Sequence, residues 1–263
     1  MNDNSNTRIQ MIADFEGDAS VLIKQREAGI YPTLCTRDLV VFPAVLTPIV
    51  VGRKKSQELV NMLEQNPETI FCIFCQKKED TEDPTTEDLY EQGTFAKLVK
   101  VINMPNEEHQ KTVIVQGLGR CKLKSIVEAQ PYYMADVESQ PELWPSEKLA
   151  KEPMFKTLTK TFFEESIKFI KHNENIPDEA VYAINEISNI FVKCNFLCNS
   201  LPFSVEDRIK MLEEEFLPDR IIVAMKALQK ELELLFLQSD IRTKTQYEME
   251  ERQKDYYLKP LIK

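Results

Sequence analysis

TFAKLVKVINMPNEEHQKTVIVQ, residues 94–116, is the stretch that decides the fold of the first half of the chain. Two runs rich in β-branched residues, Thr94–Asn103 and Thr112–Gln116, flank a segment that contains proline, asparagine and acidic residues. Proline fixes φ and asparagine tolerates unusual backbone angles, so residues of this kind form turns. The sequence therefore predicts a β-hairpin at this place.

Further short β-like runs lie on both sides of the hairpin, and one predicted helix interrupts them. The runs are Leu39–Phe42, Val45–Val51, Thr69–Cys75, Cys121–Val127 and Tyr132–Glu138. The helix begins near Lys54 and ends before Asn66-Pro67, because proline cannot continue it. Gly117-Leu118-Gly119 is interpreted as a bend between two strands. Six or so short strands around one helix predict a small β-barrel over residues 30–140.

The six cysteines favour free thiols in a reducing compartment, because no secretory signal precedes them. Cys72 and Cys75 have the spacing of half a zinc site, and Cys194 and Cys198 have a spacing that suits the other half. However, Cys72 and Cys75 lie within one continuous apolar run, and alternate residues of a strand point to opposite faces. We interpret these cysteines as small hydrophobic core residues, and we expect no metal site.

After a proline-containing linker over residues 141–153, the apolar period changes from two to 3.6 and predicts a helical bundle over residues 154–237. Three stripes carry this prediction: Leu158, Phe162, Phe163, Ile167 and Ile170; Ala180, Ile184, Ile187 and Phe191; and Val205, Ile209, Leu212 and Phe216. The third stripe follows Ser204, with Asp207 three residues on, which is the spacing of a capping box.

A fourth helix is predicted from Arg220 to about Leu258, a length of roughly 58 Å at 1.5 Å per residue. Its seam of apolar residues runs from Ile221 to Leu235 in steps of four and three residues, as in a packed helix. Beyond Gln238 the same register meets polar residues and the charge rises. We therefore expect residues 238–263 to form a long charged helix that projects from the bundle.

Composition excludes several classes of function. The formal charge of −10 does not suit a surface that grips phosphate backbones, so nucleic-acid binding is not expected. None of the six glycines opens a phosphate-binding loop, and neither His109 nor His172 has a partner suited to catalysis. No apolar run approaches the length of a bilayer span, and residues 1–29 are polar enough to predict a flexible leader. We expect no catalytic residue and no cofactor in this chain.

Four blocks of the barrel region, taken in order, are similar to the amino-terminal domain of Lon proteases: Leu34–Pro43, Val51–Ser56, Asp83–Thr94 and Val115–Arg120. The late segment Glu231–Leu258, with its final run Arg252–Leu258, also resembles the helix that leads into the Lon ATPase module. The chain is thus identified as a member of this family, as its substrate-binding domain followed by a helical region.

The resemblance implies an α+β fold, with a PUA-like β-barrel first and a helical bundle second. It further implies that an ATPase module, with ATP and Mg²⁺, and a peptidase with a Ser-Lys dyad follow beyond Lys263. The expected full-length protein is a cytoplasmic homohexamer that selects unfolded, damaged and regulatory proteins. The alternative is a stand-alone Lon-like domain that acts as a non-enzymatic adaptor or receptor, for which a helix so long would have little use.

A domain that captures unfolded chains needs exposed apolar side chains. Seven residues in two predicted connections are the candidates: Phe42, Pro43, Leu46 and Pro48 at one strand connection, and Ile102, Met104 and Pro105 at the hairpin tip. Methionine suits varied partners because its side chain adapts its shape. The alternative, that about half of these residues belong to the core, stays open at this point.

Overall fold

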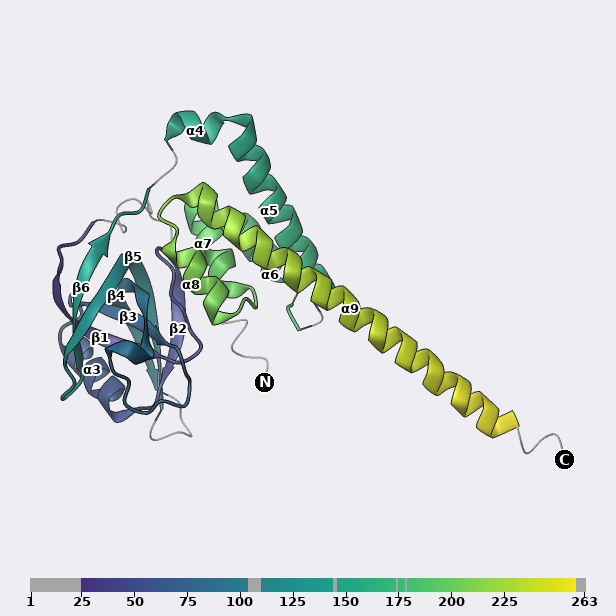
Figure 1. Cartoon of the computed structure of the whole chain (residues 1–263), viewed down its shortest axis with the longest axis horizontal. Helices are drawn as coiled ribbons and strands as arrows, with labels where there is room; N and C mark the ends of the chain where they lie inside the picture. The colour runs from purple at the N-terminus through teal and green to yellow at the C-terminus, as the bar shows by residue number, and fades with distance from the viewer. Residues whose placement is uncertain (1–24, 104–109, 144–145, 174, 178, 259–263) are drawn as a thin grey trace.

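The computed structural model describes residues 25–103, 110–143, 146–173, 175–177 and 179–258. A β-domain and a helical domain lie side by side, and one long helix extends away from both (Figure 1). The predicted α+β class is confirmed. In the part of the chain that is described, no helix combines the length and apolar character needed to cross a bilayer.

The β-domain is one six-stranded sheet that closes on itself. Its strands are β1 (Gly29–Thr36), β2 (Leu46–Val51), β3 (Ile70–Gln76), β4 (Leu89–Asn103), β5 (Lys111–Glu128) and β6 (Tyr133–Gln140). The order is β2-β5-β4-β3-β1-β6, and an additional pairing of β5 with β6 closes five strands into a ring. Strand β2 continues the sheet beside the first half of β5, and β5 is its one neighbour among the described strands.

The predicted hairpin is confirmed as β4 and β5, which pair antiparallel from Gln92 with Lys122 to Asn103 with Lys111. The bend predicted at Gly117–Gly119 is wrong, because β5 continues through it with a register shift. Glycine is needed at position 117 for a different reason: a Cβ atom there would lie 2.2 Å from the carbonyl oxygen of Phe42. The two backbones approach so closely that only glycine fits between them.

The run Leu39–Phe42 is not a strand but a loop that connects β1 to β2. Asp38 and Ala44, at φ of 49° and 61°, turn the backbone at its two ends. The loop is apolar because both of its sides are buried: Val40 and Phe42 belong to the cluster of the helical domain, and Val41 belongs to the cluster that contains α3. A buried loop and a buried strand have the same local composition, which explains the wrong prediction.

Two apolar clusters stabilise the β-domain. The first has members from β1, β3, β4, β5 and β6, including Cys72 and Phe74, and fills the ring. The second packs α3 (Lys54–Gln65) against the opposite face of the sheet through Leu59, Val60 and Leu63. Fully burying one such leucine contributes about 1.5–3 kcal/mol, so α3 is firmly held. The helix was predicted with these bounds.

The helical domain comprises α4 (Glu147–Lys151), α5 (Pro153–His172), α6 (Glu179–Glu186), α7 (Ile190–Ser200), α8 (Val205–Glu213) and α9 (Leu217–Leu258). A short 3-10 helix, η1 (Thr86–Asp88), precedes β4. One half of the capping box predicted for α8 is present: Ser204 Oγ accepts a hydrogen bond from the amide of Asp207 at 3.1 Å, while Asp207 Oδ2 accepts from the Ser204 hydroxyl at 2.9 Å. However, α8 ends at Glu213 and does not reach Phe216.

The single helix predicted from Ala180 to Phe191 is in fact two helices, α6 and α7. The break lies at Asn189, whose side-chain oxygen accepts hydrogen bonds from the amides of Phe191 at 3.0 Å and Val192 at 3.2 Å. This cap satisfies amide groups that a helix start leaves without partners. Because Ile184, Ile187 and Phe191 stay buried across the break, the apolar stripe did not reveal it.

Helix α9 has 42 residues and is therefore about 63 Å long. Its first half packs against α5 and α8 and buries Ile221, Leu228 and Leu232. From Leu237 to Met249 its side chains are exposed, and the helix leads away from the β-domain (Figure 1). The prediction of a helix that projects from the bundle is confirmed.

A buried ionic cluster joins the two domains at the segment expected to be a linker. The Glu142 side chain is only 2% exposed, with Oε1 2.9 Å from Arg120 Nε of β5 and Oε2 3.0 Å from Arg220 Nη2 of α9. Arg220 Nη1 donates to Asn195 Oδ1 at 2.8 Å, and Asn195 Nδ2 donates to the carbonyl oxygen of Pro43 at 3.0 Å. Burial raises the pKa of Glu142, although both guanidinium groups act in the opposite direction.

Candidate functional site

The β2–β5–β4 face is the side of these three strands that points away from α3. Strand register places nine residues on it in three rows: Val50, Thr112 and Ile102; Pro48, Ile114 and Lys100; and Leu46, Gln116 and Lys97. Residues that are directly opposite on paired strands share a face of the sheet. The face thus has one apolar column on β2 and a column with two lysines on β4.

The opposite side of the same strands explains this placement. Ile49, Val51, Val113 and Val115 alternate with the residues of the face and are buried in the cluster that contains α3. Since side chains of a strand alternate between two sides, the remaining set has to point away from that cluster. The sequence therefore determines the face through the positions of its core residues.

The face exposes apolar surface. Val50 is 60% exposed, and Leu46, Pro48 and Ile102 are half-buried. Ile114, at the centre of the three rows, is 4% exposed and supports its neighbours. Val99, in the irregular part of β4 beside Lys100, is 50% exposed. An exposed apolar patch on a sheet is a typical place for another polypeptide to bind.

Three of the seven residues predicted as a binding site lie on this face: Leu46, Pro48 and Ile102. Met104 and Pro105 lie outside the described residues. Val50 and Val99 were not among the predicted residues. For Val50 the signal was available, because it continues the alternation of Leu46 and Pro48.

The expectation that Phe42 and Pro43 are exposed is wrong. The Phe42 side chain has 0% exposure and packs in the cluster that contains the helices. Pro43 is buried too, and its carbonyl oxygen accepts the hydrogen bond from Asn195. The helical domain covers this connection, and a covering segment more than 100 residues away leaves no trace in the local sequence. These two residues belong to the core.

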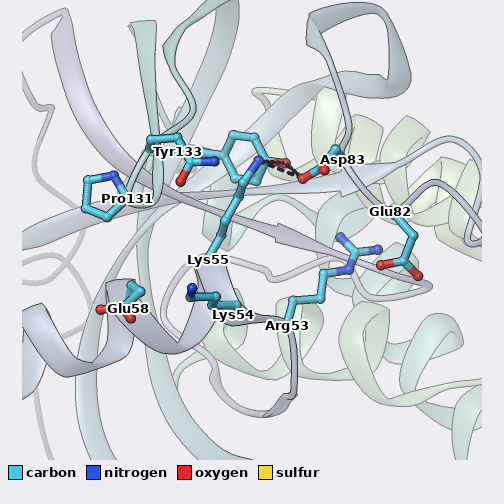
Figure 2. Close-up of a pocket in the computed structure, with 9 residues that line it drawn as sticks. Arg53, Lys54, Lys55, Glu58, Glu82, Asp83, Pro131 and Tyr133 are labelled. Atoms are coloured by element: carbon cyan, nitrogen blue, oxygen red, sulfur yellow. Dashed lines mark hydrogen bonds and ion pairs between the residues drawn. The ribbon is translucent and has the colours of Figure 1, made fainter.

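A polar cleft lies at the start of α3, between the loop that follows β3 and the turn before β6 (Figure 2). Lys55 Nζ lies 2.6 Å from Asp83 Oδ1, and the Tyr133 hydroxyl donates to the same oxygen at 3.2 Å. The hydrogen bond from Lys55 lowers the pKa of Asp83, and the hydrogen bond to Asp83 raises the pKa of Lys55.

Arg53, which also lines the cleft, donates to Gln76 Oε1 at 2.6 Å and to the carbonyl oxygen of Thr81 at 2.9 Å. These contacts use the charges of Arg53, Lys55 and Asp83 to hold the loop after β3. The cleft therefore has a structural explanation that needs no ligand.

The described residues contain no cluster of candidate metal ligands, and their cysteines are buried. No three His, Cys, Asp or Glu side chains among them gather as metal ligands. The six cysteines are free and buried. Burial raises the pKa of the Cys35 and Cys198 thiols to about 12, so both stay protonated at neutral pH. What the arrangement offers is an apolar surface for binding.

Comparisons with known proteins agree with this description. The family model of the ATP-dependent protease La (LON) substrate-binding domain matches residues 30–230. The chain is 30% identical to Lon protease of Cytophaga hutchinsonii over 91% of this chain and 29% of that protein. It is 31% identical to Lon protease of Flavobacterium johnsoniae over 88% of this chain and 28% of that protein. The chain thus spans less than a third of the length of these relatives.

Solved structures agree on the fold. The N-terminal domain of Mycobacterium avium complex Lon protease superposes with a TM-score of 0.56 at 15% identity, over 76% of this chain and 98% of that one. A Lon N-terminal domain protein from Xanthomonas campestris gives a TM-score of 0.51 at 12% identity, over 75% and 97%. At such identities the likeness shows the fold alone.

Proposed function

The chain belongs to the family of Lon substrate-binding domains, and on that premise we propose that it is the part of an ATP-dependent serine protease that engages unfolded protein substrates. One observation carries the proposal: the β2–β5–β4 face presents Val50 and its apolar neighbours to solvent. The substrate segments are regions of damaged, unfolded or regulatory proteins whose apolar side chains have lost their own core.

The size of such a surface favours weak, reversible binding. An apolar contact of roughly 400 Å² contributes about 10 kcal/mol at about 25 cal/mol per Å². Loss of translational and rotational freedom on association costs about 4–15 kcal/mol, so little net affinity remains at one site. Six copies in a homohexamer raise the apparent affinity by roughly 10²–10⁴ through effective concentration. Weak sites in a ring suit a protease that has to pass its substrate onward.

Helix α9 suits a connection between the substrate-binding region and the rest of such a protease. Its first half is fixed in the helical domain, and its exposed half leads away from the β-domain (Figure 1). We propose that α9 connects the substrate-binding region to an ATPase module, which holds ATP and Mg²⁺, in a cytoplasmic enzyme. Neither nucleotide nor metal is assigned to the residues of this chain.

The test is a single charge placed on the face. Val50→Asp is expected to weaken binding of a fluorescently labelled unfolded protein, such as casein, about ten-fold or more, as measured by anisotropy. Val127→Asp is the matched control, because Val127 is an exposed valine of β5 that lies outside the face. Both variants keep the circular dichroism spectrum of the wild type. Equal binding by Val50→Asp and wild type would refute the assignment of this face.

A further inference from the structure

Lys97 and Lys100 form a pair of cations beside the apolar column of the β2–β5–β4 face. Register places Lys100 in the row of Ile114 and Pro48, and Lys97 in the row of Gln116 and Leu46. Neither lysine forms an ion pair with a residue that the structure describes, and no carboxylate stands among the nine residues of the face. The face is therefore apolar on one side and positively charged on the other.

This local charge contrasts with the rest of the chain. Four other lysines of the β-domain are paired with carboxylates, namely Lys55, Lys111, Lys122 and Lys124. The whole chain carries 43 acidic against 33 basic residues, so an acidic segment is repelled at long range. At the face, two lysines that form no ion pair with a described residue reverse that preference locally.

We propose that the face selects substrate segments in which acidic residues stand close to apolar residues. This inference rests on the proposed function and adds the chemical class of the substrate. The apolar side chain packs on Val50, Pro48 and Leu46, and the carboxylate pairs with Lys100 or Lys97. Two strand spacings, about 9.6 Å, separate the columns on β2 and β4. An extended segment that crosses the strands covers this distance in about three residues, since each residue rises about 3.3 Å.

The chemistry of the face favours a peptide over a nucleic acid. Binding to a phosphate backbone requires several clustered cations that release counterions. Two lysines beside valine, proline, leucine and isoleucine side chains provide instead a contact that is mainly apolar, with a modest charge term. Each exposed ion pair changes the affinity by about two- to five-fold.

Three fluorescent peptides test the inference. They share one apolar sequence and carry Asp, Asn or Lys three residues from each apolar anchor, and anisotropy gives their Kd values at low and physiological salt. For the wild-type chain, the Asp peptide is expected to bind about three- to ten-fold more tightly than the Asn peptide, and the Lys peptide more weakly than both. These differences decrease as salt screens the charges.

Charge-reversed variants test whether the preference for acidic peptides comes from Lys97 and Lys100. The double variant Lys97→Glu with Lys100→Glu is expected to invert the order of the three peptides. The matched control, Lys122→Glu with Lys124→Glu, changes two exposed lysines elsewhere on β5 and is expected to keep the wild-type order. Thermal unfolding establishes that all the chains are folded.

The outcomes separate the two proposals. Equal affinity for the three peptides, or an unchanged order in the Lys97 and Lys100 double variant, overturns the charge preference and leaves the binding face itself intact. If neither the peptides nor an unfolded protein bind, the proposed function fails as well. The inference is also overturned if an uncharged apolar peptide and single-stranded DNA displace the Asp peptide equally well.

Discussion

Arg220 Nη2 lies 3.0 Å from Glu142 Oε2, so an ion pair ties the first turn of α9 to the segment that leaves the β-domain. The other oxygen of the same carboxylate meets Arg120 of β5. One buried side chain therefore connects three parts of the chain that are far apart in sequence.

Glu142→Gln is expected to lower the free energy of unfolding by about 3–5 kcal/mol, because buried Arg220 loses its carboxylate partner and buried Arg120 keeps only Glu215, at 4.0 Å. Urea denaturation followed by circular dichroism measures the change. Glu138→Gln is the matched control: it removes an exposed carboxylate that pairs with Lys124, and it should cost less than about 1 kcal/mol. A Glu142→Gln chain as stable as the wild type would contradict the role given to the cluster.

Gly117→Ala is expected to destabilise the chain by about 2 kcal/mol or more, since the new Cβ would lie 2.2 Å from the Phe42 carbonyl oxygen. The loop and the strand have to separate to admit it. Gly52→Ala provides the comparison, because its Cβ would meet its nearest neighbour, Gln110, at an ordinary 3.6 Å. The midpoint of thermal unfolding distinguishes the two variants, and an equal effect would exclude close approach as the reason for glycine at 117.

The contact between Lys55 and Asp83 makes stability depend on pH in a definite direction. The hydrogen bond from Lys55 holds the pKa of Asp83 below its ordinary 3.8, so the ionised carboxylate is favoured in the folded chain. Its contribution is fully present above pH 3.8 and is lost as pH falls through the lower, folded pKa. Asp83→Asn should therefore unfold at a lower temperature than the wild type at pH 7 and pH 5.

This difference should disappear in more acidic solution, where the wild-type carboxylate is itself protonated. Asp80→Asn is the control, because Asp80 lies in the same loop and forms no ion pair with a described residue. Scanning calorimetry at several pH values measures both variants. A deficit of Asp83→Asn that persists at the lowest pH would mean that packing, not charge, is what the substitution removes.

Periodicity predicted the elements whose side chains alternate between core and solvent. Helix α3 and the first half of α9 were visible because each has one buried face and one polar face. The hairpin of β4 and β5 was visible because turn-forming residues separate two runs rich in β-branched residues. The break at Asn189 was not, since the buried stripe from Ala180 to Phe191 continues across it. Asn189 is itself a good helix cap and was the one local signal of the break.

The proposed binding face was only partly predictable for a related reason. Leu46 and Pro48 alternate with buried residues of β2, so their exposure follows from the strand pattern. Phe42 and Pro43 have equally apolar surroundings, but a helical domain that begins about 110 residues later covers them. The position of Lys97 and Lys100 follows only from strand register, which places them on the same face as β2, across the intervening β5, although β2 lies about 50 residues earlier.

Closure of the sheet bears on the proposed binding of unfolded protein chains. An open sheet edge has unpaired amide and carbonyl groups, which can hydrogen-bond to a strand of another chain and so lead to aggregation. Here β5 and β6 close the ring, and of the described strands β2 is the one with a single neighbour. Pro48 stands in the middle of β2 and lacks an amide hydrogen, which interrupts any ladder that a foreign strand begins. Under the proposed function, substrate segments would therefore bind through their side chains and would not add to the sheet as a further strand.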